Sequence, residues 1–109
     1  MNPVNPPLGG CPSWCEKPAG HDWEDVWTHG PIRFHTWTRA ITAPHGHRGD
    51  EIRVEEAEQH TETGVVRRRT VVLDVEAPTE WDLHTAEKAS GLLTQAIGLA
   101  RLDPPGDPQ

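Results

Sequence analysis

Three stretches of the chain alternate bulky hydrophobic and polar side chains, which is the pattern of β-strands. They are residues 32–42 (IRFHTWTRAIT), 51–59 (EIRVEEAEQ) and 65–77 (VVRRRTVVLDVEA). The first and third are rich in β-branched or aromatic residues, which favour extended structure, and the second alternates Ile52 and Val54 with charged residues. Short segments rich in Gly, Pro, His and Thr separate them and predict turns. The simplest arrangement of such neighbours is a three-stranded antiparallel meander.

The last hydrophobic stretch repeats with helical spacing and predicts an amphipathic helix from about Thr85 to Leu102. Pro104 and Pro105 follow and would end it. A helix of this length spans roughly 27 Å, which is enough to cover one face of a small sheet. The expected fold class is therefore α+β, with one C-terminal amphipathic helix packed on the sheet. The predicted apolar stripe comprises Ala86, Ala89, Leu93, Ala96, Ile97 and Ala100.

The remaining segments show no periodicity. Residues 1–10 and 103–109 are rich in Pro and Gly, and we expect a disordered arm and a disordered tail. Residues 11–102 then form a single βββα domain. Only 34% of the chain is hydrophobic, with one Phe and no Tyr. A domain with so small a core usually needs a disulfide or a metal to hold it, above all in its irregular N-terminal part.

Cysteine and histidine side chains gather in that part of the chain. Cys11 and Cys15 form a C-x3-C pair, and His21 and His29 follow. Two thiolates and two neutral imidazoles form a common ligand set for structural Zn²⁺ and balance its charge. We therefore expect a zinc-stabilised N-terminal loop held by these four residues. His35 is the alternative fourth ligand, but it lies within a predicted strand, so His29 is preferred.

Other interpretations of the two cysteines stay open. A disulfide is geometrically possible, although so short a loop would give little entropic stabilisation. A redox dithiol would more naturally be a C-x-x-C motif beside a βαβ unit. A cysteine nucleophile activated by His21 or His29 would need an oxyanion site, and no motif indicates one.

The N-terminal motif resembles that of a family of small actinobacterial proteins without an assigned activity. The likeness rests on CPSWC at Cys11–Cys15, the spaced His residues, and HG at His29–Gly30, with strands and a C-terminal amphipathic helix after them. It would extend from Cys11 to about Arg101. The resemblance implies Cys11, Cys15, His21 and His29 as a set, and it implies no particular role.

The formal net charge is −7, which disfavours nonspecific binding to nucleic acid. The one dense basic run, Arg67–Arg69, faces an acidic run, Glu55–Glu58, and predicts a cross-strand charge ladder on the solvent face. No apolar run approaches the roughly 20 residues of a membrane span, and no secretory signal pattern is present. A cytoplasmic protein that keeps its thiols reduced is the expectation.

Five tryptophans must supply much of the packing. We expect Trp14 to shield the metal and Trp81 to fix the link between sheet and helix. Trp23 and Trp27 lie in an acidic segment and are candidates for partner binding.

The expected function is a small zinc-binding accessory or regulatory protein that acts through an unidentified protein partner, as a monomer or weak dimer, without catalytic residues. One alternative is a nucleic-acid-binding regulator that uses Arg67–Arg69. Another is a small zinc-dependent hydrolase with an open metal position and Glu24 as base.

Overall fold

The computed structural model of the chain describes residues 8–42, 49–76 and 80–102. The elements in these residues are β1 (Asp25–Trp27), β2 (Gly30–Ala40), β3 (Glu51–Thr61), β4 (Gly64–Asp74) and α1 (Leu83–Ala100). The α+β class and the C-terminal helix are confirmed. The prediction of three strands was wrong, because the short strand β1 lies in a segment predicted to be irregular. The predictions of a disordered arm and a disordered tail concern residues outside the described ones, except for residues 8–10.

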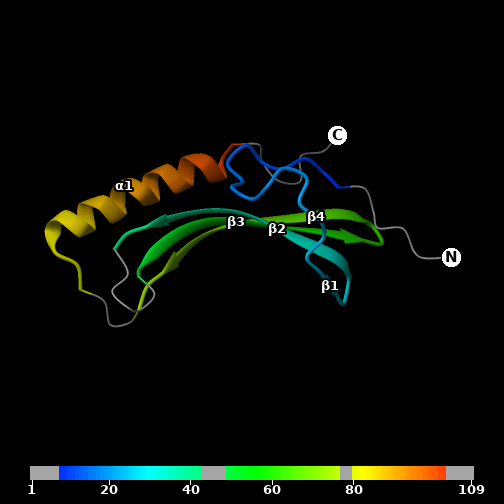
Figure 1. The fold of residues 1–109 in the computed structure, drawn as a ribbon, viewed down its shortest axis with the longest axis horizontal. Coiled ribbons are helices and arrows are strands. Elements are labelled where there is room, and N and C mark those ends of the chain that lie inside the picture. Colours follow the sequence, from blue (N-terminus) through cyan, green and yellow to red (C-terminus); the bar gives the residue numbers. More distant parts are fainter. Residues whose placement is uncertain (1–7, 43–48, 77–79, 103–109) are drawn as a thin grey trace.

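The strands form one antiparallel sheet in the order β1-β2-β3-β4, so the predicted meander is confirmed for the three long strands. Strand β1 adds to the beginning of β2, with Asp25 opposite Ile32 and Trp27 opposite Gly30. Helix α1 and the N-terminal segment before β1 (residues 8–24) both lie over the same face of the sheet (Figure 1). The helix covers one end of that face, and the N-terminal segment, drawn in blue, covers the other.

The covered face changes character along its length. Under the helix, Trp37 lies opposite Val54, and Val54 lies opposite Val71, so this end is apolar. Under the N-terminal segment the facing side chains are polar, and they form two rows across β2, β3 and β4. The rows are Arg33–Glu58–Arg67 and His35–Glu56–Arg69.

The charge ladder between the acidic and basic runs is therefore present, but it lies on the covered face and not on the solvent face as predicted. Glu56 and Glu58 are fully buried, as are Arg33 and His35. The physical reason is the N-terminal segment, which covers this half of the sheet and excludes water from it. Each buried charge of Arg33, Glu56 and Glu58 has an opposite charge within its own row, because Arg33 pairs with Glu58 and Arg69 pairs with Glu56.

Helix α1 packs on the apolar end through a stripe that shares Ala89, Ala96 and Ala100 with the predicted one but differs from it elsewhere. Ala89 and Ala96 are buried, and Leu92 and Leu99 pack against the same core. Two residues of the predicted stripe, Leu93 and Ile97, are 40% and 39% exposed. The apolar residues of this helix form two neighbouring stripes, and helical spacing alone does not determine which of them faces the sheet.

Both ends of the helix are tied to specific side chains. It begins two residues earlier than predicted, and the Asp82 carboxylate accepts a hydrogen bond from the Thr85 N–H at 2.8 Å. Trp81 packs against the core and its indole Nε1 donates to Asp50 at 2.8 Å, which confirms its expected place between sheet and helix. At the other end, Arg69 donates to the carbonyl of Ala100 at 2.9 Å.

Gly30, the first residue of β2, lies so close to the backbone of β3 that a side chain does not fit there. Its φ is +132°, and a Cβ there would lie 2.0 Å from the backbone oxygen of His60. Gly64 has a similar φ of +128° but open space around it. Both Gly→Ala variants meet backbone strain, of about 1–3 kcal/mol. We expect Gly30→Ala to lower the free energy of unfolding by at least about 2 kcal/mol more than Gly64→Ala, because only Gly30 also meets a clash. Urea denaturation of both variants measures this difference, and equal losses would contradict the close contact.

Candidate metal centre

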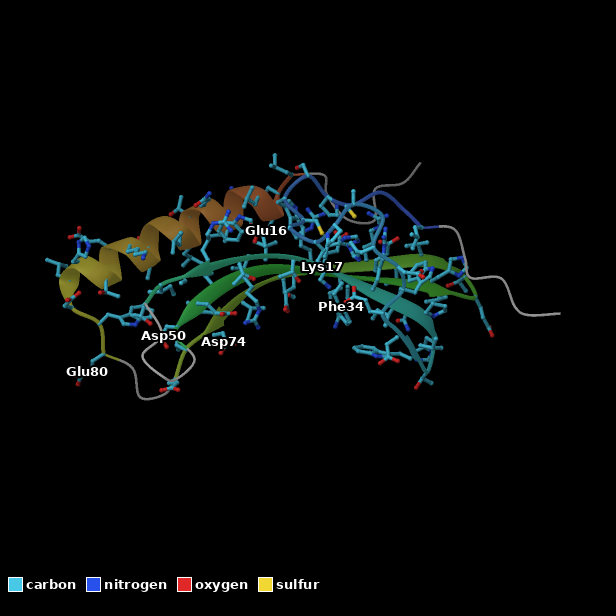
Figure 2. All side chains as sticks on the ribbon, viewed as in Figure 1. Glu16, Lys17, Phe34, Asp50, Asp74 and Glu80 are labelled. Atoms are coloured by element: carbon cyan, nitrogen blue, oxygen red, sulfur yellow. The ribbon has the colours of Figure 1, made fainter. Side chains whose placement is uncertain are left out.

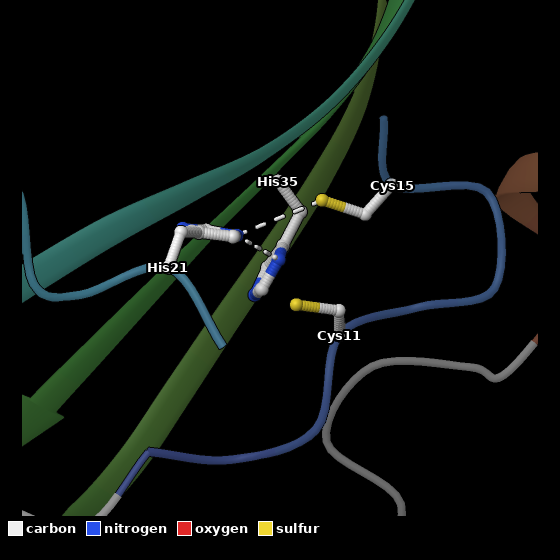
Figure 3. Close-up of side chains that lie close together, drawn as sticks. All are labelled: Cys11, Cys15, His21 and His35. Carbon is white, nitrogen blue, oxygen red and sulfur yellow. Dashed lines mark hydrogen bonds between the residues drawn. The ribbon is translucent and has the colours of Figure 1, made fainter. Parts of the chain in front are cut away.

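Four side chains with metal-binding atoms meet where the N-terminal loop covers the sheet. Cys11, Cys15 and His21 come from the loop, and His35 comes from β2 (Figure 3). Their ligand atoms all lie within 4.8 Å of one another. A tetrahedral zinc site, with bonds of about 2.0–2.3 Å, has ligand atoms roughly 3.3–3.8 Å apart. The group therefore needs only small side-chain adjustments to hold a metal ion.

Three of the four predicted ligands belong to this group, and the fourth does not. His35 stands beside the other three, whereas His29 lies in the turn between β1 and β2. The preference for His29 is thus corrected in favour of the alternative. Strand alternation explains the difference, because His35 points to the covered face, on the same side as Arg33 and Trp37.

The loop residues reach the site through two tight turns. The Cys15 N–H donates to the Pro12 carbonyl at 3.0 Å, and the His21 N–H donates to the Pro18 carbonyl at 3.1 Å. Gly20, with φ +75°, supplies the left-handed conformation that the second turn requires. Each turn therefore ends on a ligand. Both sulfur atoms lie between the loop and the sheet (Figure 2, yellow), and both cysteines are free thiols.

Two glutamates attach the loop to the outer edge of β2. The Glu16 N–H donates to the Thr36 carbonyl at 2.9 Å, and its carboxylate accepts from the Thr38 N–H at 2.8 Å. In the same way, the Glu24 N–H donates to the Ile32 carbonyl at 2.8 Å, and the Glu24 carboxylate accepts from the Phe34 N–H at 2.6 Å. These contacts give backbone groups of β2 hydrogen-bond partners along the part of its edge that β1 does not cover, as a further strand would.

His35 is held by a buried carboxylate. Its Nε2 lies 2.8 Å from Glu58 Oε1, while its Nδ1 lies 3.2 Å from His21 Nε2. With Nε2 donating to Glu58, the lone pair of Nδ1 faces the ligand group. A carboxylate behind a histidine ligand is typical of protein metal sites, where it fixes the tautomer and ring orientation.

The charges around Glu58 keep it ionised. Burial opposes ionisation, but hydrogen bonds from His35 and Arg33 and the nearby charge of Arg67 outweigh it and lower the pKa of Glu58 to about 2. Arg33 donates to Glu58 at 2.9 Å and to the backbone carbonyl of His21 at 2.7 Å, and it also bonds the carbonyl of Gly9. Arg33 therefore links the sheet to two points of the loop.

The second row connects the loop to the helix. Arg69 donates to Glu56 at 2.6 and 3.0 Å, and its guanidinium carbon lies 5.1 Å from the ring centroid of Trp14. Trp14, between the two cysteines, is 5% exposed and belongs to the hydrophobic core. Trp14 was expected to shield the metal, and its position in the core also makes it the anchor of the loop.

His21 is suited to bind as a neutral ligand. Burial lowers its pKa, and His35, Arg33 and Lys17 lower it further, against a smaller opposing effect of Glu24. Its Nε2 lies 3.6 Å from Cys15 Sγ. A lowered pKa favours the uncharged imidazole, which is the form that binds metal.

Glu24, the base of the hydrolase alternative, is already engaged. It accepts hydrogen bonds from Lys17 at 2.7 Å and from the Phe34 N–H. Burial acts against its ionisation, but these bonds lower the pKa of Glu24 below its usual value. A carboxylate with a lowered pKa and occupied oxygens is a weak base.

The two candidate partner-binding tryptophans differ in exposure. Trp27 is 51% exposed. Trp23 is half-buried, with the Arg33 guanidinium 5.8 Å from its ring and the His60 ring 6.5 Å away.

Arg33, Glu56 and Glu58 belong to the candidate site, which the sequence analysis did not predict for any of them. One signal could have found them, because Arg33 and His35 alternate on one strand as Glu56 and Glu58 do on its neighbour. Opposite charges on facing positions of adjacent strands indicate pairing.

Comparisons of the chain with protein-family models, with curated proteins and with solved structures found no match. Among the described residues, no helix has the length and apolar character needed to cross a bilayer.

Proposed function

We propose that the chain is a small zinc-binding accessory or regulatory protein that acts through contact with another protein and performs no catalysis. The observation that carries this proposal is the convergence of two thiols and two imidazoles within 4.8 Å. Cys and His ligands in a two-and-two set favour Zn²⁺ over Mg²⁺ or Ca²⁺, which prefer oxygen ligands.

The full ligand set supports a structural role for the metal. Four protein ligands complete a tetrahedral site and leave no position for a reacting water, whereas catalytic zinc sites keep one position open. Zinc here would hold the N-terminal loop over the buried charged rows. The proposal includes a reducing compartment, the cytoplasm, since both ligand sulfurs must stay thiolates.

The nucleic-acid alternative has less support. Arg67 and Arg69 point to the covered face and pair with Glu58 and Glu56. Within the basic run, only Arg68 lies on the uncovered face of the sheet, where its neighbour on β3 is Ala57. The run is therefore no continuous basic surface for phosphates.

Zinc content and its removal test the proposal. We expect native mass spectrometry and elemental analysis of the purified protein to find one zinc ion per chain. Structural zinc contributes about 10–16 kcal/mol in small domains, so chelation should abolish the tryptophan near-UV circular dichroism and the cooperative unfolding transition. An apoprotein with both thiols free and an unchanged transition would refute the proposal.

A further inference from the structure

The turns at one end of the sheet border an open groove, which we call the turn-end groove. Its two hollows have volumes of about 410 and 550 Å³, and Thr28 and His29 line both of them. Val26 and Trp27 line the larger hollow, and Glu62 and Val66 line the smaller one. The turns that line the groove, between β1 and β2 and between β3 and β4, lie at the end of the sheet away from the beginning of helix α1 (Figure 1).

Trp27 is an exposed aromatic side chain that is already held in place. Its indole Nε1 donates to Asp25 Oδ2 at 3.2 Å, and its ring centroid lies 5.7 Å from that of Phe34. Half of the side chain is nevertheless accessible, and the neighbouring Val26 is 72% exposed. A rigid, exposed tryptophan loses little entropy on binding, and such residues dominate the energy of many interfaces.

The charges around the groove select its occupant. Asp25 and Glu62 are exposed, and no Lys or Arg is among the residues that line the two hollows. The whole chain carries a formal charge of −7. A Lys or Arg side chain on the face of Trp27 would gain a cation–π interaction and attraction to these carboxylates. Nucleic acid and a second copy of this acidic chain would be repelled.

The edge of β1 is not free to accept another strand at this point. The N–H of Val26 donates to its neighbour Asp25 Oδ1 at 2.8 Å. A partner segment must therefore be recognised through side chains, and sheet extension contributes little.

We infer that the turn-end groove binds a basic segment of a partner protein, with Trp27 as the aromatic anchor and Asp25 and Glu62 as the charge partners. This inference rests on the proposed function as an interaction protein and specifies the surface and the chemistry of the partner.

The test is an NMR titration of the zinc-loaded protein with three capped hexapeptides that alternate valine with lysine, glutamate or serine. We expect saturable binding of the lysine peptide alone, with shift changes confined to residues 25–30 and 59–66. Trp27→Ala should weaken binding about tenfold, which corresponds to loss of one cation–π anchor. Leu83→Ala, at an exposed apolar residue of the helix, should leave the affinity unchanged.

A second variant keeps the test decisive if Trp27→Ala disturbs the fold. Asp25→Asn with Glu62→Gln should weaken binding and reduce its salt dependence. The inference is overturned by equal binding of the glutamate or serine peptide, by shifts elsewhere, by failure of the lysine peptide to bind, or by dilution-dependent shifts that reveal self-association. If the protein holds one zinc ion while the peptide fails, only this inference falls. If zinc is absent, the proposed function falls.

Discussion

Replacing His35 with alanine is expected to abolish zinc binding, whereas replacing His29 should leave it intact. His35 Nδ1 faces the other three ligands, while His29 lies in a turn at the end of the sheet. Loss of residues that only orient a metal ligand already weakens binding by about 10–100-fold, so loss of the ligand itself should exceed a hundredfold. Competition with a chromophoric chelator measures the affinity of both variants.

A buried histidine could also matter for packing alone, so stability must be compared with and without metal. We expect the unfolding transition of His29→Ala to respond to chelator as the wild type does, and that of His35→Ala not to respond. Zinc held tightly by His35→Ala but lost from His29→Ala would reverse the assignment of the fourth ligand.

Glu58→Gln is expected to lower the free energy of unfolding of the zinc-loaded protein by about 3–5 kcal/mol, because it leaves the buried charge of Arg33 without its partner. The matched control is Glu55→Gln on the same strand. Glu55 pairs with Arg53 at 3.1 Å on the opposite, partly exposed face, and exposed pairs contribute at most about 1 kcal/mol. Guanidinium chloride denaturation of both variants gives the comparison.

A second measurement separates support of the metal from general stability. Glu58→Gln should also weaken zinc binding about 10–100-fold, since Glu58 orients His35, and Glu55→Gln should not. The lowered pKa of Glu58, about 2, agrees in sign. Because folding favours its ionised form, Glu58 stabilises the fold at neutral pH and loses this effect as the pH falls through that value. Equal losses of unfolding free energy in Glu58→Gln and Glu55→Gln would contradict a buried ion pair between Glu58 and Arg33.

The local part of the site could be predicted from the sequence. Cys11, Cys15 and His21 lie within one short irregular segment, and their types and spacing indicate a metal site without knowledge of the fold. The fourth ligand could not be chosen in this way. His29 and His35 are both near in sequence, and only the face on which the strand places His35 decides between them.

The charged rows show the same limit for the fold. Pairing of the acidic and basic runs follows from neighbouring strands, and it was predicted correctly. Their burial was not, because charged residues are normally exposed, and the cover comes from a loop far away in sequence. Strand β1 was missed since its three residues are too few to show a period.

The position of the N-terminal loop has a consequence for the order in which the molecule is built. The residues that cover the charged rows are made before the strands and the helix that they rest on. Glu58 and Arg69 follow on β3 and β4, and the Ala100 carbonyl that Arg69 binds lies at the end of the helix. The loop therefore reaches its native contacts only after nearly the whole domain has left the ribosome, so zinc capture with all four ligands in place would be a late step of its biosynthesis.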